Sequence, residues 1–455
     1  MTASKASYGI TSLVSAMHDT AAISPDICII GAGSSGVAVA KALRDQGLLF
    51  DCFEKGSNLG GMWRYENDNG LSCAYRSLHI DTSRNNLGYP DFPIPDDQPD
   101  FLSHRKLLTY LESYADHFKV RSAIAFNTEV ASVEKTGDER WRVVTGDGRA
   151  RDYRAVVVAN GHLWNPRWPS FPGTFDGVAI HSSEYRTAAP FDDKNVLVVG
   201  IGNSAVDIAV DLCKRAKSVT LSTRTGAHVM PKYMMGIPTD RWSAFFSRKL
   251  KFPTLLTRMI MARLAFFAVG NQRRFGIPKP KHPMWREHAT ISQELLPYIG
   301  HGWIGIKPNI VKLAGDAVEF ADGSRAPFDA IIYATGYKTT FPFLTPSLFS
   351  VTDGEMVDLY RRMTPPGQPG LYFAGLVQPI GATIPLVEVQ ARWIAAALAD
   401  RMALPSAAEM AREVRSHHAQ KQRTWLNSAR YTLEVDFKSY VGALRKDMER
   451  NQAGL

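Results

Sequence analysis

Two stretches of the chain repeat one pattern of hydrophobic and polar positions. In each, a nearly continuous apolar run leads into a glycine-rich turn, and a helical stretch and a second apolar run follow. Continuous apolar runs are typical of strands that are buried on both faces of a parallel sheet. We therefore expect two βαβ units. The predicted strand, helix and strand cover 26–30, 37–46 and 48–53 in the first unit, and 195–199, 206–216 and 218–222 in the second.

The first glycine-rich turn has the features of a dinucleotide-binding loop. Gly31, Gly33 and Gly36 form a GxGxxG motif between strand and helix, and Glu54 follows the second apolar run. The glycines allow a tight turn and a close approach of the backbone to a pyrophosphate, which the helix N-terminus attracts. Glu54 would accept hydrogen bonds from a ribose diol and repel a 2′-phosphate, so this site favours FAD or NAD over NADP.

The second turn differs at the position that reads the ribose. The loop keeps two glycines and has alanine in place of the third, and its second strand ends in polar residues without an acid: Gly200, Gly202 and Ala205, then Ser222, Thr223 and Arg224. The guanidinium of Arg224 is a planar fork of donors suited to a phosphate, and the two hydroxyls can join it. This pattern predicts NADPH at the second site.

Two dinucleotide sites in one chain indicate a flavoprotein that a nicotinamide reduces. Its electrons can pass to a disulfide, to another acceptor or to O2. The four cysteines, Cys28, Cys52, Cys73 and Cys213, form no CxxC pair, which argues against the disulfide and fits a reducing cytoplasm. The twelve histidines show no metal-ligand spacing, and we expect no metal.

Charge and hydropathy restrict the possible partners. Lys and Arg number 53 against 44 Asp and Glu, and no long basic run indicates a nucleic-acid partner. The first 24 residues lack a secretory signal, and no stretch reaches the about 18 uncharged apolar residues of a transmembrane segment. Residues 252–269 come nearest. We expect an amphipathic helix there, packed over a substrate cavity or a partner, and the alternative is a helix on a membrane surface.

The length of the chain favours two domains. Strands are expected at 141–144 and 155–159 in the first domain, a proline-rich linker at 165–172, and a strand at 330–333 before the chain returns. We predict an α/β fold with two Rossmann-like dinucleotide-binding domains, the NADPH domain inserted into the FAD domain. The expected parts are an N-terminal extension (1–25), an FAD-binding domain (26–169 and 334–455), and an NADPH-binding domain (170–333) with a helical substrate-pocket insertion at about 240–300.

Five separated motifs resemble those of the flavin-containing monooxygenases. The segment from Phe175 to Tyr185 matches their FxGxxxHxxxY fingerprint, which ends in Trp in the related Baeyer–Villiger monooxygenases. The other matches are GGxW at 60–63, the segment around 89–93, ATGY at 334–337, and a closing segment at 375–393. The resemblance covers about residues 26–400.

The resemblance implies FAD and NADPH as cofactors and assigns residues to each. For FAD it implies Gly31, Gly33, Ser34, Ser35, Gly36, Glu54, Gly61, Met62, Trp63, Asp81, Thr82, Thr335 and Gln378. For NADPH it implies Gly200, Gly202, Asn203, Ser204, Ala205, Ser222, Thr223 and Arg224. The closing segment is expected to form a helix capped by Thr383, with its positive end aimed at the flavin.

Asp81, Asn203 and His181 are the candidates for a catalytic role. The family usually has Asn, and sometimes His, at position 81, beside the reactive edge of the flavin. Asp81 is therefore either protonated, and able to donate as an amide does, or held ionised by a cation such as Arg84 and turned away. His181 either orients the hinge between the domains or acts directly.

By this resemblance the protein is a monooxygenase that uses NADPH, FAD and O2. It would oxygenate a small soft nucleophile, an amine nitrogen or a thioether sulfur, through a C4a-(hydro)peroxyflavin. The alternatives are Baeyer–Villiger oxygenation of ketones and an uncoupled NADPH oxidase. We expect a cytoplasmic protein, and a homodimer is one open assembly state.

Overall fold

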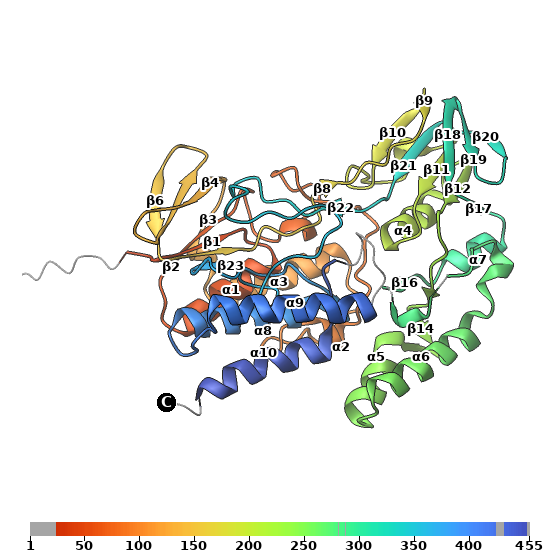
Figure 1. Ribbon diagram of the computed structural model, residues 1–455. Coiled ribbons are helices and arrows are strands. Elements are labelled where there is room, and N and C mark those ends of the chain that lie inside the picture. The colour runs from red at the N-terminus through yellow and green to blue at the C-terminus, as the bar shows by residue number, and fades with distance from the viewer. Residues whose placement is uncertain (1–23, 281, 287, 425–431, 453–455) are drawn as a thin grey trace, which may run out of the picture.

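The computed structural model describes residues 24–280, 282–286, 288–424 and 432–452. Residues 1–23 of the expected N-terminal extension lie outside this part of the chain. Two α/β bodies lie side by side, each built on a five-stranded parallel sheet, and the C-terminal helices lie on the first body (Figure 1). The second sheet is inserted in the sequence of the first, which confirms the predicted fold class.

The first sheet has the strand order β23-β7-β1-β2-β3, and all its neighbours are parallel. Its strands are β1 (Ile27–Ile30), β2 (Phe50–Phe53), β3 (Ile124–Ala125), β7 (Ala155–Val158) and β23 (Leu371–Phe373). Alternate residues of β1 enter different cores: Ile27 and Ile29 join the cluster with helix α1 (Ser34–Asp45), and Cys28 joins Trp141 on the other face. Burial on both faces explains the continuous apolar runs.

The second sheet has the order β10-β21-β11-β12-β17, again with parallel neighbours. Its strands are β10 (Val178–His181), β11 (Asn195–Val199), β12 (Ser218–Ser222), β17 (Ile304–Lys307) and β21 (Ala330–Tyr333). Strands β11, β12 and β21 have the predicted bounds. The helices after the glycine turns, α1 and α4 (Asn203–Leu212), each begin three residues earlier than expected, because the last residues of each loop already adopt helical geometry.

Smaller sheets surround the two main ones. One sheet contains β4 (Val130–Lys135), β5 (Trp141–Thr145) and β6 (Ala150–Tyr153). Another contains β9 (Gly173–Phe175), β18 (Ile310–Gly315), β19 (Ala317–Phe320) and β20 (Arg325–Pro327). Three strand pairs complete the set: β13 (Val229–Met230) with β16 (Thr290–Ile291), β14 (Tyr233–Met234) with β15 (Ile237–Pro238), and β24 (Gln378–Ile380) with β25 (Glu434–Asp436). Thus β5 lies in a separate antiparallel sheet rather than beside β7. The two crossovers between the bodies pair with each other through β8 (Asn165–Pro166) and β22 (Tyr337–Lys338).

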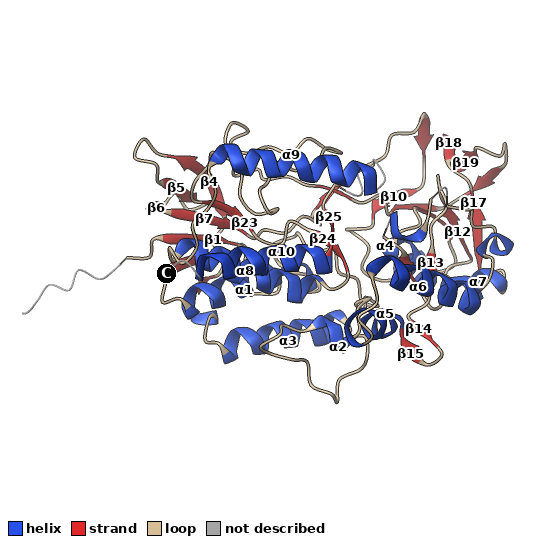
Figure 2. Ribbon diagram, turned by 60° about the horizontal axis from the view of Figure 1, so that its bottom comes forward, coloured by secondary structure: helices blue, strands red, loops and turns tan. Residues whose placement is uncertain are grey.

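The remaining helices are α2 (Arg84–Leu87), α3 (His104–His117), α5 (Thr239–Ala244), α6 (Thr254–Val269), α7 (Leu295–Gly300), α8 (Thr383–Leu398), α9 (Ala407–Thr424) and α10 (Phe437–Gln452). Within the described residues, no helix is long and apolar enough to cross a membrane. Helix α6 buries only Thr257, Met261 and Ala265. Helices α5 and α6 lie below the second body in Figure 1 and are turned toward the viewer in Figure 2.

Candidate functional site

A cleft of about 1620 Å³ runs between the two bodies and is lined by both glycine-rich loops. Both loops follow the carboxyl ends of parallel strands, β1 and β11, where ligands bind in open α/β sheets. The volume exceeds the 300–1000 Å³ or so that a single small ligand requires, so there is room for two dinucleotides. The two crossovers also line the cleft, through residues such as Arg167 and Thr335.

The first loop forms a cradle, and its glycines are required for different reasons. A Cβ on Gly31, which has a φ of +99°, would lie 2.7 Å from the carbonyl oxygen of Ala159, and one on Gly36 would lie 1.8 Å from that of Gly31. Protein packing therefore accounts for both. A Cβ on Gly33 would meet only Gly61, at an ordinary 3.8 Å. Gly33 faces the cleft, so its small size leaves room for a ligand.

Glu54 binds the first loop and lines the cleft. Its Oε2 accepts a hydrogen bond from the backbone N–H of Ala32 at 2.7 Å, and its Oε1 accepts one from Gly56 at 2.9 Å. The Glu54 residue is 4% exposed. Because a carboxylate has about four lone-pair sites, Glu54 can hold the loop and still accept from a ribose diol.

Most of the residues assigned to FAD line this cleft. They are Gly31, Gly33, Ser34, Ser35, Glu54, Gly61, Met62, Trp63, Asp81, Thr82, Thr335 and Gln378, whereas Gly36 packs beneath the loop. The N-terminal end of α8 also faces the cleft, through Thr383 and Ile384. The expected cap is wrong in detail: Ala382 occupies the N-cap position and Thr383 is the first helical residue. The first-turn N–H groups therefore have no side-chain cap, and the cleft receives their positive end.

The second loop is similar, but its hydroxyls are already engaged. Ser222 donates its hydroxyl to the carbonyl of Pro308 at 2.8 Å, and Thr223 donates to that of Thr225 at 2.5 Å. Neither hydroxyl proton is free for a phosphate. Arg224 is exposed at the cleft and makes no ion pair with any described residue, so its guanidinium can donate to a phosphate there. Gly200, Gly202, Asn203, Ser204 and Ala205 also line the cleft.

Asp81 and Asn203 meet across the cleft. Asn203 Nδ2 donates to Asp81 Oδ2 at 2.7 Å, and the backbone N–H of Ile291 donates to Asn203 Oδ1 at 3.0 Å, which orients the amide. The other Asp81 oxygen lies 3.2 Å from the ammonium of Lys232. Burial raises the pKa of Asp81, although the positive charge of Lys232 opposes the rise. Arg84 is not the partner that we expected, because it pairs with Asp100 at 3.0 Å.

A second buried carboxyl, Asp207, lies one helical turn after Asn203 on α4 and also lines the cleft. The phenol of Tyr75 donates to its Oδ2 at 2.8 Å. Burial and the nearby charge of Asp81 raise the pKa of Asp207. Two buried acids with one ammonium near them favour a state in which a carboxyl keeps its proton.

His181 lies apart from this group. It is fully buried at the end of β10, with Nε2 3.1 Å from the carbonyl oxygen of Gly336 and Nδ1 accepting from the N–H of Ser183 at 3.1 Å. Burial lowers its pKa. In its neutral form the His181 ring donates to the carbonyl of Gly336. This bond links β10, at the start of the second body, to the crossover that returns to the first body. The structure therefore does not bring His181 to Asp81 and Asn203.

The structure also adds residues that the motifs did not indicate. Lys232 and Asp207 belong to no motif. In the sequence, only the presence of a charged residue among apolar neighbours indicates either of them as a site residue. Thr432 and Leu433 of the C-terminal segment line the cleft because β25 pairs with β24. From the described residues of 240–300, by contrast, only His282 and His288 do so. Helices α5 and α6 therefore do not line this cleft, and their place in a substrate pocket stays a prediction.

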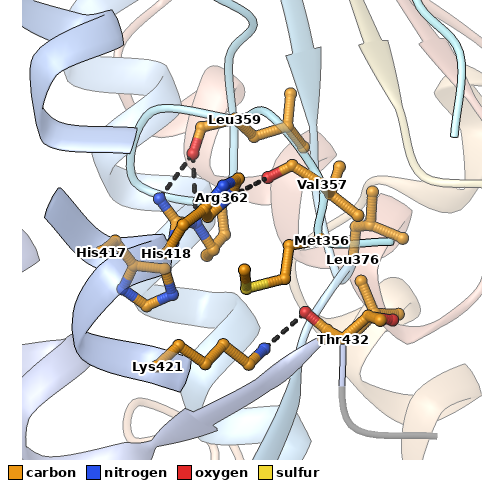
Figure 3. Close-up of a pocket in the computed structure, with 10 residues that line it drawn as sticks. Met356, Val357, Leu359, Arg362, Leu376, His417, His418, Lys421 and Thr432 are labelled. Carbon is orange, nitrogen blue, oxygen red and sulfur yellow. Dashed lines mark hydrogen bonds between the residues drawn. The ribbon is translucent and has the colours of Figure 1, made fainter. Parts of the chain in front are cut away.

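A small cavity lies behind the C-terminal wall of the cleft (Figure 3). Its volume of about 10 Å³ suffices for one water molecule at most, so it is no substrate site. Lys421 donates to the carbonyl of Thr432 and Arg362 donates to that of Leu359. The Lys421 bond holds α9 against the segment that lines the cleft, whereas the Arg362 bond closes the local turn at 359–362.

Comparisons with known proteins agree with this geometry. The family described as "Flavin-binding monooxygenase-like" matches residues 24–451. Flavin-containing monooxygenase 5 of Oryctolagus cuniculus is 37% identical over 90% of this chain and 80% of its own. S-allyl-L-cysteine S-oxygenase from Allium sativum is 27% identical, with a TM-score of 0.70 over 93% of this chain and 88% of its own. Cyclohexanone monooxygenase from Rhodococcus sp. Phi1, bound to NADP+, is 18% identical with a TM-score of 0.69 over 94% and 98%, and shares the fold.

Proposed function

The chain belongs to the flavin-binding monooxygenase-like family, and from this we propose how its residues serve the reaction. The enzyme uses FAD, NADPH and O2 to oxygenate a soft heteroatom. FAD, when bound, accepts hydride and activates O2, so the protein has to bind and orient the cofactors and to exclude water. We assign FAD to the first loop with Glu54, and NADPH to the second loop with Arg224. Residues 26–169 with 334–455, and 170–333, are proposed as the two cofactor domains.

The observation that carries this assignment is the difference between the two loops across one cleft. The buried Glu54 lies at the first loop, where a diol would bind, and the exposed guanidinium of Arg224 lies at the second, where a 2′-phosphate would bind. The open Gly33 cradle and the uncapped end of α8 both favour a pyrophosphate-bearing cofactor between them.

Asp81, Asn203 and Lys232 would control the proton and the water at the meeting point of the two cofactors. Asn203 donates to one oxygen of Asp81 and Lys232 pairs with the other, so that side chains of the second body reach an acid of the first. A protonated Asp81 can donate a hydrogen bond, whereas an ionised one can only accept. We propose that the neutral form serves oxygen transfer, and that His181 positions the crossover from outside the cleft.

The substrate class follows from the family and from the fingerprint. The motif ends in Tyr185, whose hydroxyl donates to Asp211 at 2.6 Å, and not in the Trp of the ketone-oxygenating enzymes. A relative is named for S-oxygenation and another, dimethylaniline monooxygenase (N-oxide-forming) 2 of Oryctolagus cuniculus, for N-oxidation. We propose thioethers and tertiary amines as substrates.

The test is a competition between three small probes: a thioether, a tertiary amine and a cyclic ketone. NADPH consumption, hydrogen peroxide and product mass are measured together. We expect sulfoxide or N-oxide to account for most of the NADPH, with little ester. Ester as the main product would replace the proposed substrate class, and peroxide equal to NADPH with no organic product would make the enzyme an oxidase.

Two finer assignments accompany this proposal. The four cysteines are unpaired, which suits a reducing compartment such as the cytoplasm. We also propose a homodimer, and light scattering distinguishes it from a monomer.

A further inference from the structure

The proposed oxygen transfer needs one proton for each turnover. NADPH supplies a hydride, the O–O bond breaks, and one oxygen atom forms a bond with the sulfur or nitrogen of the substrate. The other oxygen atom leaves as water, which takes its two hydrogen atoms from the hydride and from one proton. Bulk water is kept out of such a site, so a titratable side chain has to bring that proton. The requirement rests on the proposed function.

His288 lines the cleft and lies just before β16. Its side chain is 24% exposed, so the ring has access to water. Burial raises the pKa of Asp81, and the positive charges of Lys232 and of a protonated His288 oppose that rise. The imidazole therefore lies close enough to act on the acid. Histidine is the side chain that gains and loses a proton most readily near neutral pH.

A buried carboxylate lies behind His288. The side chain of Glu434, at the start of β25, is 0% exposed, and its Oε2 lies 3.8 Å from Nδ1 of His288. Neither oxygen accepts a hydrogen bond from any residue that the structure describes. The pairing of β25 with β24 places Glu434 opposite Gln378 and fixes its backbone. A carboxylate buried in this way has lost its hydration, and an imidazolium beside it compensates that loss.

Two other cations near Glu434 have partners elsewhere. Lys421 of α9 donates to a backbone carbonyl of the C-terminal segment, and burial lowers its pKa to about 7, although the charge of Glu434 opposes this shift. Arg258 of α6 pairs with Asp436, two residues further along β25, at 3.1 Å. Within the described ranges, His288 is the only residue that forms an ion pair with Glu434.

Asp81 is the acceptor that the cleft offers for a proton from His288. One of its oxygens accepts from Asn203 at 2.7 Å, and the other lies 3.2 Å from the ammonium of Lys232. Burial and the charge of Asp81 raise the pKa of the neighbouring Asp207 to about 7. Two acids that interact in this way hold a proton more readily than either does alone. A proton that reaches Asp81 is therefore kept in the cleft.

We propose that His288 carries the proton of the reaction from water to Asp81, and that Glu434 is the positioning residue that holds the ring. Glu434 faces Nδ1, which leaves Nε2 for the exchange. An N–H bond of the imidazolium breaks and an O–H bond forms on Asp81, directly or through one water molecule. The neutral ring then takes the next proton from water. Only protons move in these steps, and Glu434 stays ionised throughout.

The rate of sulfoxide formation by the full-length holoenzyme across pH tests the proposal. His288→Gln keeps a hydrogen-bonding side chain but cannot carry the proton, so the rate should fall roughly 100-fold. Imidazole added to the buffer should restore part of that rate, and KM for NADPH should not change. Glu434→Gln keeps the size of the side chain and removes its charge. It should shift the pH at which the rate declines downward by about 1 pH unit.

NMR titration of the histidine ring carbons in the holoenzyme gives a readout that does not depend on turnover. The signal that His288→Gln removes from the spectrum belongs to His288. Its midpoint should lie about 1 pH unit lower in Glu434→Gln than in the wild type, because the positive ring loses a neighbouring negative charge.

Matched controls make the same changes where no such pair exists. His301→Gln removes an exposed histidine that does not line the cleft, and Asp436→Asn removes a charge from the same face of β25 as Glu434. Both controls should keep the wild-type rate and pH profile, and all variants should keep the wild-type Tm and FAD content.

Three results would overturn the proposal: a rate that His288→Gln leaves unchanged, a loss that added imidazole does not restore, or a His288 midpoint that Glu434→Gln does not move. A wild type that forms no oxygenated product would instead overturn the proposed function. In that case the NMR midpoint still decides whether Glu434 and His288 act as a pair.

Discussion

At the scale of single residues, position 81 is where this chain departs from its family. The structure supplies a cation for the unusual carboxylate, but from Lys232 of the inserted body and not from Arg84. Asn203, Asp207 and His288 face this acid, and burial together with the charge of Asp81 also raises the pKa of Asp207.

We predict that hydrogen peroxide leakage per NADPH rises with pH in the wild type. Burial raises the pKa of Asp81 above its ordinary value, so the neutral, donating form persists until pH passes that raised pKa. Asp81→Asn should flatten the profile. Lys232→Met removes the charge that lowers this pKa, and should move the midpoint upward by about 1–3 pH units. Identical profiles in all three proteins would assign the control of leakage to another group.

Arg224 should determine the preference for NADPH. Its guanidinium makes no ion pair with any described residue, and the neighbouring hydroxyls donate elsewhere. Arg224→Ala should raise KM for NADPH about 10- to 150-fold, the loss of one charge-assisted contact, and leave KM for NADH nearly unchanged. Arg325→Ala, on an exposed strand of the same body, is the control. An unchanged NADPH/NADH ratio would place phosphate recognition at another residue.

At the scale of elements, the turn between β1 and α1 serves folding and binding with different glycines. Gly36→Ala would force a Cβ into the carbonyl of Gly31, and should lower Tm by several degrees even without FAD. Gly33→Ala meets no such contact at its φ of −74°. It should therefore fold with the wild-type apoprotein Tm and lose FAD. Thermal unfolding of the apoproteins with flavin release distinguishes the two, and equal loss of Tm in both variants would refute the distinction.

At the scale of the whole molecule, the C-terminal helices connect global stability to the cleft. Burial lowers the pKa of Lys421 to about 7, whereas an unfolded lysine keeps its ordinary value near 10.4. The unfolded chain therefore binds more protons between these values, and stability rises with pH across that window. The increase in Tm from pH 7 to pH 9 should be smaller in Lys421→Met than in the wild type. Lys446→Met, at an exposed position of α10, should retain the wild-type increase.

The sequence by itself determined the features that depend on short-range pattern. Strands buried on both faces require continuous apolar runs, and a pyrophosphate-binding turn requires glycine at defined spacing, so neighbours in the chain predict both βαβ units. The same pattern places Glu54 and Arg224 just after the second strands, where both line the cleft. The family motifs extended this to Met62, Trp63 and Gln378, which line the cleft.

Only the tertiary structure decided which distant residues meet. Asp81, Asn203 and Lys232 are brought together because the two bodies meet at one cleft. No local pattern indicates that contact, since Asp81 and Asn203 lie 122 residues apart in the chain. For the same reason the apolar run at 252–269 predicted a helix but not which face of that helix is buried. Whether such a helix covers a cavity or meets solvent depends on what packs beside it, and here α6 faces outward.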